Sequence, residues 1–186
     1  MIFEYILNGT GWSDVKLKIN DCECVFNPSY VSEPLGDLVD SLLEMIPGFI
    51  PEDELMTNVT FHWDEEPTIV RWNFIRQGSE LLKIKVTTYD DDLSNEKVEL
   101  NELCNFNAFV NEVVKALEKM LSKHGIVGYK ETWSGSDFPI SGYLKLKHYI
   151  DGNKKYSIKT LNGDEGKTSD LSIEISTLTS LGSQIS

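Results

Sequence analysis

Three runs of alternating apolar and polar residues follow one another closely in the first half of the chain. The runs are Val59-Phe61-Trp63, Val70-Trp72-Phe74 and Leu82-Ile84-Val86. A period of two places alternate side chains on the two faces of a β-strand. Because only short polar turns separate the runs, we expect a three-stranded antiparallel meander, with a short fourth strand over residues 98–100.

The N-terminal part shows the same period. Val15, Leu17 and Ile19 alternate with two lysines, and a turn at Asn20-Asp21 leads into residues 22–26. This pattern predicts a hairpin, and the apolar stretch over residues 2–7 predicts a strand before it.

Two segments change to the helical period. In residues 32–48 the apolar residues fall at i, i+3, i+4, i+7, i+8 and i+11, with Ser32 as the expected N-cap and Pro47-Gly48 as the end. Residues 105–123 carry a longer apolar stripe that we expect to stop at His124-Gly125. The fold class predicted is α+β, a mainly antiparallel sheet with two amphipathic helices packed on one face.

The last third of the chain is less clear. Residues 139–150 fit a helix or a strand equally well, since the apolar positions satisfy both periods. Leu171, Ile173 and Ile175 alternate before a Ser/Thr-rich end. We therefore expect a single domain over residues 1–150 and a C-terminal extension over 151–186, made of one or two appended strands and a frayed tail.

The charge of the chain is strongly acidic and unevenly distributed. The net charge is −13 over 186 residues; the first 102 hold 7 Lys+Arg and 21 Asp+Glu, and the remainder hold 10 and 9. A negative field repels nucleic acid and anionic membranes and attracts basic proteins, although it also serves solubility. No signal peptide or membrane-spanning stretch is recognisable, so we expect a cytoplasmic protein that binds neither nucleic acid nor membrane.

Motifs for catalysis and cofactors are missing from the sequence. The three cysteines, Cys22, Cys24 and Cys104, form neither a zinc pattern nor a disulfide framework, and we expect them to be reduced packing residues. No glycine-rich phosphate loop or calcium-binding loop is present. We therefore expect no cofactor, no metal and no catalytic residue.

Two acidic clusters are the candidate site. They follow the first and third strands of the meander, and their members are Asp64, Glu65, Glu66, Asp90, Asp91 and Asp92. Because alternate strands of a meander run parallel, both clusters fall at the same end of the sheet. They are consistent with solvated turns, with a docking surface for a basic partner, or with a carboxylate or metal site.

Two polar residues of the meander face away from its core. His62 lies between Phe61 and Trp63, and Arg71 precedes Trp72. We expect Arg71 to form an ion pair with Glu66 or a neighbouring carboxylate.

Four segments carry a family resemblance: WSDVKLKI, SYVSEPLGDLVDSLL, WDEEPTIVRWNF and GYKETWSGSDFP. Together they resemble a family of small uncharacterised bacterial proteins, which is similar to the immunity proteins encoded beside polymorphic toxins. The resemblance implies a non-enzymatic protein that neutralises a toxin, and it implies no catalytic residue.

The function expected from these features is a non-enzymatic protein-binding module. Its concrete form is an immunity protein that covers the cationic surface of a basic toxin or nuclease through the acidic clusters. The alternatives are a carboxylate- or metal-dependent enzyme that uses the same acidic turns, and a subunit that associates with copies of itself.

Overall fold

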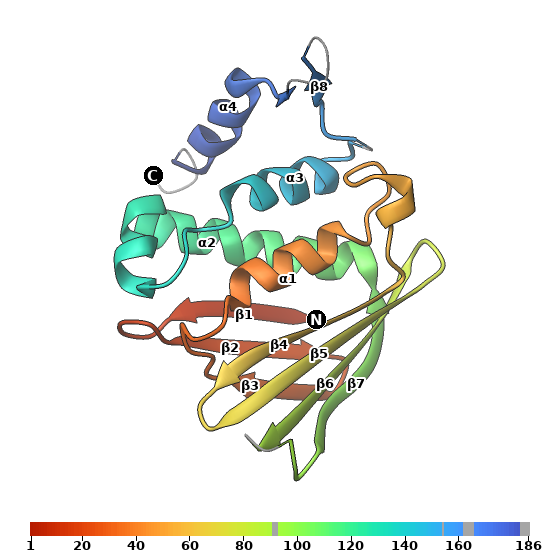
Figure 1. Cartoon of the computed structure of the whole chain (residues 1–186), viewed down its shortest axis with the longest axis vertical. Helices are drawn as coiled ribbons and strands as arrows, with labels where there is room; N and C mark the ends of the chain where they lie inside the picture. Colours follow the sequence, from red (N-terminus) through yellow and green to blue (C-terminus); the bar gives the residue numbers. More distant parts are fainter. Residues whose placement is uncertain (91–92, 154, 162–165, 183–186) are drawn as a thin grey trace.

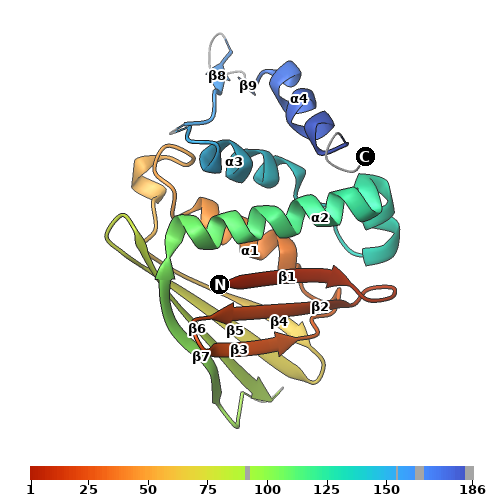
Figure 2. The same cartoon turned by 180° about the vertical axis from the view of Figure 1, so that it is seen from behind.

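The structure is a computed structural model that describes residues 1–90, 93–153, 155–161 and 166–182. Figures 1 and 2 show it from opposite sides. The strands are β1 Ile2–Leu7, β2 Ser13–Ile19, β3 Cys22–Phe26, β4 Asn58–Glu65, β5 Thr68–Gln77, β6 Leu81–Asp90, β7 Lys97–Asn105, β8 Lys159–Thr160 and β9 Lys167–Thr168. The helices are α1 Pro34–Leu43, α2 Phe106–Trp133, α3 Ile140–Ile150 and α4 Leu171–Gly182, with a 3-10 turn η1 over Glu52–Glu54.

The strands form antiparallel sheets in chain order. One sheet has the order β1-β2-β3, the second has the order β4-β5-β6-β7, and β8 and β9 form a small ladder of their own. The predicted meander is present with its expected register, in which Phe61 lies opposite Trp72 and Trp72 opposite Val86. The α+β class predicted from the sequence is therefore confirmed, and β7 is longer than the pattern indicated.

The two larger sheets face each other across an aromatic core. The ring centroids of Tyr5 and Trp63 lie 6.4 Å apart, and those of Phe26 and Trp72 lie 5.8 Å apart. Side chains from both sheets thus fill one interior, as in a sandwich. The sheets also meet beside β3 and β7, where Asn20 donates a hydrogen bond of 2.7 Å to Glu102.

The helices lie together on one side of the sheets (Figures 1 and 2). Helix α2 runs along β1, where Phe109 contacts Phe3 with centroids 6.0 Å apart, and α1 packs along β4. Both helices bury the apolar stripe that the sequence predicted. Each stripe is removed from water by packing against the sheets, because a helix alone cannot bury its own apolar face.

Three of the predicted helix boundaries are wrong. Helix α1 ends at Leu43, before the expected end at Pro47-Gly48. Ser32 does not cap α1: Glu33 holds the N-cap position, and the Ser32 hydroxyl instead accepts a hydrogen bond of 2.9 Å from the Asp64 amide. Gly125 does not end α2, because its left-handed φ of 66° kinks the chain, which then continues as helix to Trp133.

The C-terminal third of the chain contains helices α3 and α4, one where the sequence fitted a helix or a strand and one where a strand was expected. Residues 140–150 form helix α3, which packs against both α1 and α2. Leu171, Ile173 and Ile175 were expected in a strand but belong to helix α4. The short strands β8 and β9 precede α4 and lie outside the alternating stretch on which the expected one or two strands were based, while residues 183–186 of the expected tail lie outside the described residues.

The cysteines differ in their surroundings. All three are free thiols, and Cys24 is buried as expected of a packing residue. Cys22 is exposed and donates a hydrogen bond of 3.2 Å to Glu102, which corrects the expectation of a packing role for this residue.

Within the described residues, no helix has the length and apolarity needed to span a membrane.

Candidate functional site

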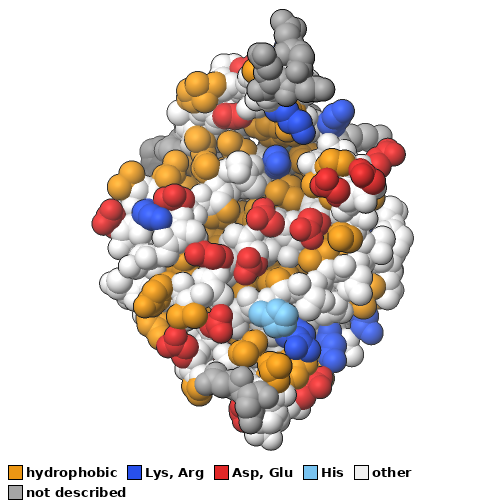
Figure 3. Space-filling view, viewed as in Figure 1, with side chains coloured by type: hydrophobic (Ala, Val, Ile, Leu, Met, Phe, Trp, Pro, Cys, Tyr) orange, Lys and Arg blue, Asp and Glu red, His pale blue; other side chains and the backbone are white. Residues whose placement is uncertain are grey.

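A group of six carboxylates lies along α1 and the η1 turn, and none of them forms an ion pair with another described residue. We call this group the α1 acidic surface. Its members are Asp37, Asp40, Glu44, Glu52, Asp53 and Glu54. Figure 3 shows acidic side chains as a band that crosses the middle of the molecular face over α1 toward η1. The band exists because α1 turns its apolar stripe toward the sheets, so the polar positions of the helix face outward.

A hollow of about 540 Å³ lies between α1 and η1. Asp40, Glu44, Asp53 and Glu54 line it, together with one cation, Lys145 of α3. No ion pair joins Lys145 or any other basic residue to the α1 acidic surface within the described part of the chain. The surface therefore holds several negative charges that no bonded cation balances.

The pKa values of Asp37 and Asp40 on α1 are both raised, which shows that this arrangement disfavours the charged carboxylates. Partial burial, and then the neighbouring carboxylates Glu33 and Asp40, raise the pKa of Asp37 from its ordinary value of 3.8 to about 6. Burial also raises the pKa of Asp40, while Lys145 acts in the opposite direction. Carboxylates with raised pKa values disfavour their own ionised form, so the folded protein is less stable with them charged.

The substitution Asp37→Asn is expected to stabilise the protein at neutral pH. The folded state binds the Asp37 proton more tightly than the unfolded chain, so stability falls as pH rises from about 4 to 6 and the penalty is complete above pH 6. Since the side chain is only partly buried, screening by solvent reduces the gain to about 1 kcal/mol at pH 7. Urea unfolding at pH 7 and at pH 3.5 measures it, and the gain should vanish at the lower pH.

Asp21→Asn is the matched control for this prediction. Asp21 is an exposed carboxylate in the turn between β2 and β3. Its removal should change the free energy of unfolding by less than about 0.5 kcal/mol at either pH. An equal stabilisation by both substitutions would show that net charge, rather than the surroundings of Asp37, is responsible.

The register places the described members of the two acidic clusters at one end of the second sheet. The register places Glu65 opposite Thr68 on β5, and Thr68 opposite Asp90 on β6. Glu65 and Asp90 are thus two strand spacings apart, about 10 Å. Asp91 and Asp92 lie outside the described residues.

Two of the four described carboxylates at this end, Glu65 and Asp90, make hydrogen bonds that stabilise the local fold. Glu65 is half buried and accepts a bond of 2.6 Å from the backbone amide of Asn27, which ties β4 to the end of β3. Asp90 accepts a bond of 2.6 Å from the Asn95 side chain within the turn that follows β6. These bonds favour a structural role for Glu65 and Asp90, whereas Glu66 is exposed; the predicted docking role of this sheet end stays a prediction.

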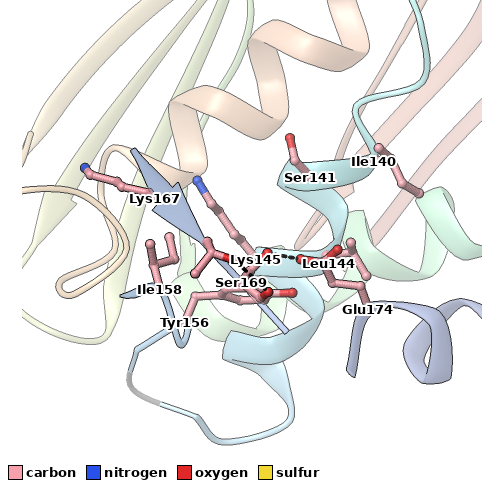
Figure 4. Close-up of a pocket in the computed structure, with 10 residues that line it drawn as sticks. Ile140, Ser141, Leu144, Lys145, Tyr156, Ile158, Lys167, Ser169 and Glu174 are labelled. Carbon is pink, nitrogen blue, oxygen red and sulfur yellow. Dashed lines mark hydrogen bonds between the residues drawn. The ribbon is translucent and has the colours of Figure 1, made fainter. Parts of the chain in front are cut away.

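A smaller apolar pocket of about 250 Å³ lies between α3 and the C-terminal segment. Ile140, Leu144 and Ile158 contribute to its lining, and Ser169 closes one side through a hydrogen bond to Glu174. Figure 4 shows that the ammonium groups of Lys145 and Lys167 point away from the pocket, the former toward α1. The Lys145 ammonium group therefore faces the α1 acidic surface.

Asp37, Asp40 and Glu44 on the polar side of α1 are not part of the site that the sequence predicts. The signal that was available is the short acidic run over 52–54, but nothing in the sequence places that run beside α1.

Among the described residues, no group of three or more His, Cys, Asp or Glu side chains is arranged to hold a metal ion. Comparison of the chain with family models, curated proteins and solved structures finds no match.

Proposed function

We propose that the chain is a non-enzymatic protein-binding module whose α1 acidic surface docks a basic partner. The observation that carries the proposal is the concentration of carboxylates around the α1–η1 hollow, none of them in an ion pair with another described residue. A cationic partner surface would relieve their mutual repulsion, and the acidic field would accelerate the encounter.

The concrete form that we propose is an immunity protein which neutralises a basic toxin or nuclease by covering its cationic surface. Three features support it: the net charge of −13, the acidic face along α1, and the resemblance of four sequence segments to immunity-like bacterial proteins. The sheet end with Glu66 and Asp90 is a second acidic region that the same partner can reach electrostatically.

The proposal predicts that neutralising the α1 acidic surface abolishes capture of a basic partner. The test uses tagged protein to retain partners from the native host at low and at moderate salt. The surface variant is Asp37→Asn/Asp40→Asn/Asp53→Asn/Glu54→Gln. We expect the wild type to retain a basic protein that dissociates as salt rises, and we expect the variant to retain at least about tenfold less of it.

A second variant of the same net charge serves as the control. It neutralises four exposed carboxylates that make no ion pair with another described residue: Glu4→Gln/Asp21→Asn/Glu80→Gln/Glu131→Gln. This control should retain the partner almost as well as the wild type. Equal loss in both variants would reduce the effect to net charge, and unchanged capture by the surface variant would contradict the proposal.

A third variant separates the two acidic regions. Asp64→Asn/Glu66→Gln/Asp90→Asn removes charge at the sheet end and leaves α1 intact. If this variant alone loses the partner, the docking surface is the sheet end predicted from the sequence and not α1.

A further inference from the structure

A polar hollow of about 470 Å³ lies on the outer face of the second sheet and shares no lining residue with the hollow between α1 and η1. Its lining comes from the side chains of β4, β5 and β6 that point away from the core, and from Glu96 before β7. The register aligns His62 with Arg71 and aligns Asn73 with Lys85, so these four side chains lie in two adjacent rows.

Arg71 is held in one orientation by two neighbours. Its Nε–H donates a hydrogen bond of 2.9 Å to His62 Nε2, and its Nη1 donates one of 3.0 Å to the Tyr89 hydroxyl. The guanidinium carbon lies 4.5 Å from the centroid of the Tyr89 ring. The expected ion pair with Glu66 is therefore wrong: among the described residues Arg71 has a histidine and a tyrosine as partners, and no carboxylate.

The neighbours of Arg71 are neutral acceptors. His62 can accept at Nε2 only when that nitrogen is unprotonated, and burial, followed by the charge of Arg71, lowers the pKa of His62. The Tyr89 hydroxyl accepts without a charge of its own. The full positive charge of Arg71 is thus left uncompensated by its hydrogen-bond partners, and Nη2 has no acceptor among the described residues.

Other polar groups surround this guanidinium. Asn73 donates its amide to Asn58 and Thr60 at 2.7 and 2.9 Å, which leaves its carbonyl oxygen as an acceptor. Lys85 lies 3.5 Å from Glu96, a long and exposed contact that contributes little to stability. The hollow therefore offers one oriented fork of N–H donors, a second cation and several weaker donors and acceptors.

We propose that this hollow binds a carboxylate or phosphate group carried by a small polar molecule, with the guanidinium of Arg71 as the anion ligand. A planar guanidinium donates two parallel hydrogen bonds to two oxygens of such a group, and prior orientation by His62 and Tyr89 lowers the entropic cost of forming them. Lys85 is placed to turn from Glu96 to the anion, and Asn73 is placed to bond hydroxyl groups of the same molecule.

The test is a titration of the full chain with three probes of similar size. Gluconate carries a carboxylate, glucose 6-phosphate carries a phosphate, and glucose carries neither. The readout is the 15N shift of the Arg71 Nε, followed by NMR. We expect a saturable shift with at least one anion, and no shift with glucose; the anion that binds more tightly identifies the source of the oxygens.

Four variants make the assignment specific. Arg71→Gln is expected to weaken binding by at least about tenfold, as read from amide shifts of the hollow, and Arg71→Lys to weaken it as well, because the ammonium group lacks the fork. Tyr89→Phe keeps the ring and removes one acceptor, so it should weaken binding only a few-fold. Lys123→Gln removes an exposed positive charge from α2 and should leave binding unchanged.

Several results would overturn the proposal. These are a glucose shift equal to that of the anions, equal effects of Arg71→Gln and Lys123→Gln, or no saturable shift below about 10 mM of either anion. Arg71→Lys keeps the positive charge and Tyr89→Phe keeps the aromatic ring, so we expect both variants to fold. They therefore still test the proposal if Arg71→Gln fails to fold.

Discussion

Replacing Trp72 by alanine is expected to lower the free energy of unfolding by about 3–5 kcal/mol. Trp72 is fully buried at the centre of the aromatic core between the two sheets. Its ring lies 4.6 Å from Trp63, stacks on Phe61 at 5.9 Å, and meets Phe26 of the opposite sheet at 5.8 Å. The substitution removes all of these contacts and leaves a cavity that rigid β-sheets cannot close.

Urea unfolding followed by far-UV circular dichroism measures this effect without depending on tryptophan fluorescence. Trp12→Ala is the matched control, because Trp12 is 37 % exposed and lies in the connection before β2. We expect the control to lose less than about 1 kcal/mol. Comparable losses in the two variants would contradict the packing of the two sheets around Trp72.

Replacing Gly142 by alanine is expected to lower the free energy of unfolding by about 1–3 kcal/mol. Gly142 is buried in α3 at its contact with α1. A Cβ atom there would overlap Cγ1 of Val39 and lie 3.6 Å from the Val39 Cβ. Valine is stiff in a helix and Val39 is fully buried, so the two helices must move apart to accept the methyl group.

Gly36→Ala in α1 is the control, and its effect should have the opposite sign. A Cβ at Gly36 meets nothing closer than the Glu33 Cβ at 3.9 Å. Alanine therefore improves helix propensity without a clash, and we expect a gain of about 0.5–1 kcal/mol. If both substitutions stabilise the protein, α3 does not pack on α1 at Gly142. Thermal or urea unfolding of the two variants decides between these outcomes.

The types of the main strands and helices in the first 123 residues follow from the sequence because each of these segments has one strong period, whereas several of their boundaries do not. The two hairpin strands, the meander and the stripe of α1 each bury one face, so their patterns admit only one element type. Residues 140–150 fit both periods, and only packing of Tyr143 and Leu146 into the helical layer selects a helix. Leu171 lies in helix α4 with 65 % of its surface exposed, so burial of this residue does not explain why a helix replaces the predicted strand.

The hydrogen-bond partners of Arg71 could not be predicted from the residues next to it in the sequence. The sequence correctly placed His62 and Arg71 on the outer face of the sheet, but it expected a carboxylate beside Arg71 where the structure has His62 and Tyr89. Tyr89 reaches Arg71 because β6 lies beside β5 in a particular register. Such a pair depends on strand alignment, which a single chain pattern leaves open.

The sequence alone determined the α+β class, the element types of the meander and the long helix, and the strong acidity of the first 102 residues. These properties can be read from the order of residues along the chain, since they depend only on the periodicity of apolar positions and on the number of charged residues. Only the tertiary structure decided that the sheets face each other, that α1 and residues 52–54 form one acidic surface, and that Arg71 is oriented over a hollow. Those features depend on contacts between residues distant in sequence, which arise when apolar faces find partners and leave their polar sides together at the surface.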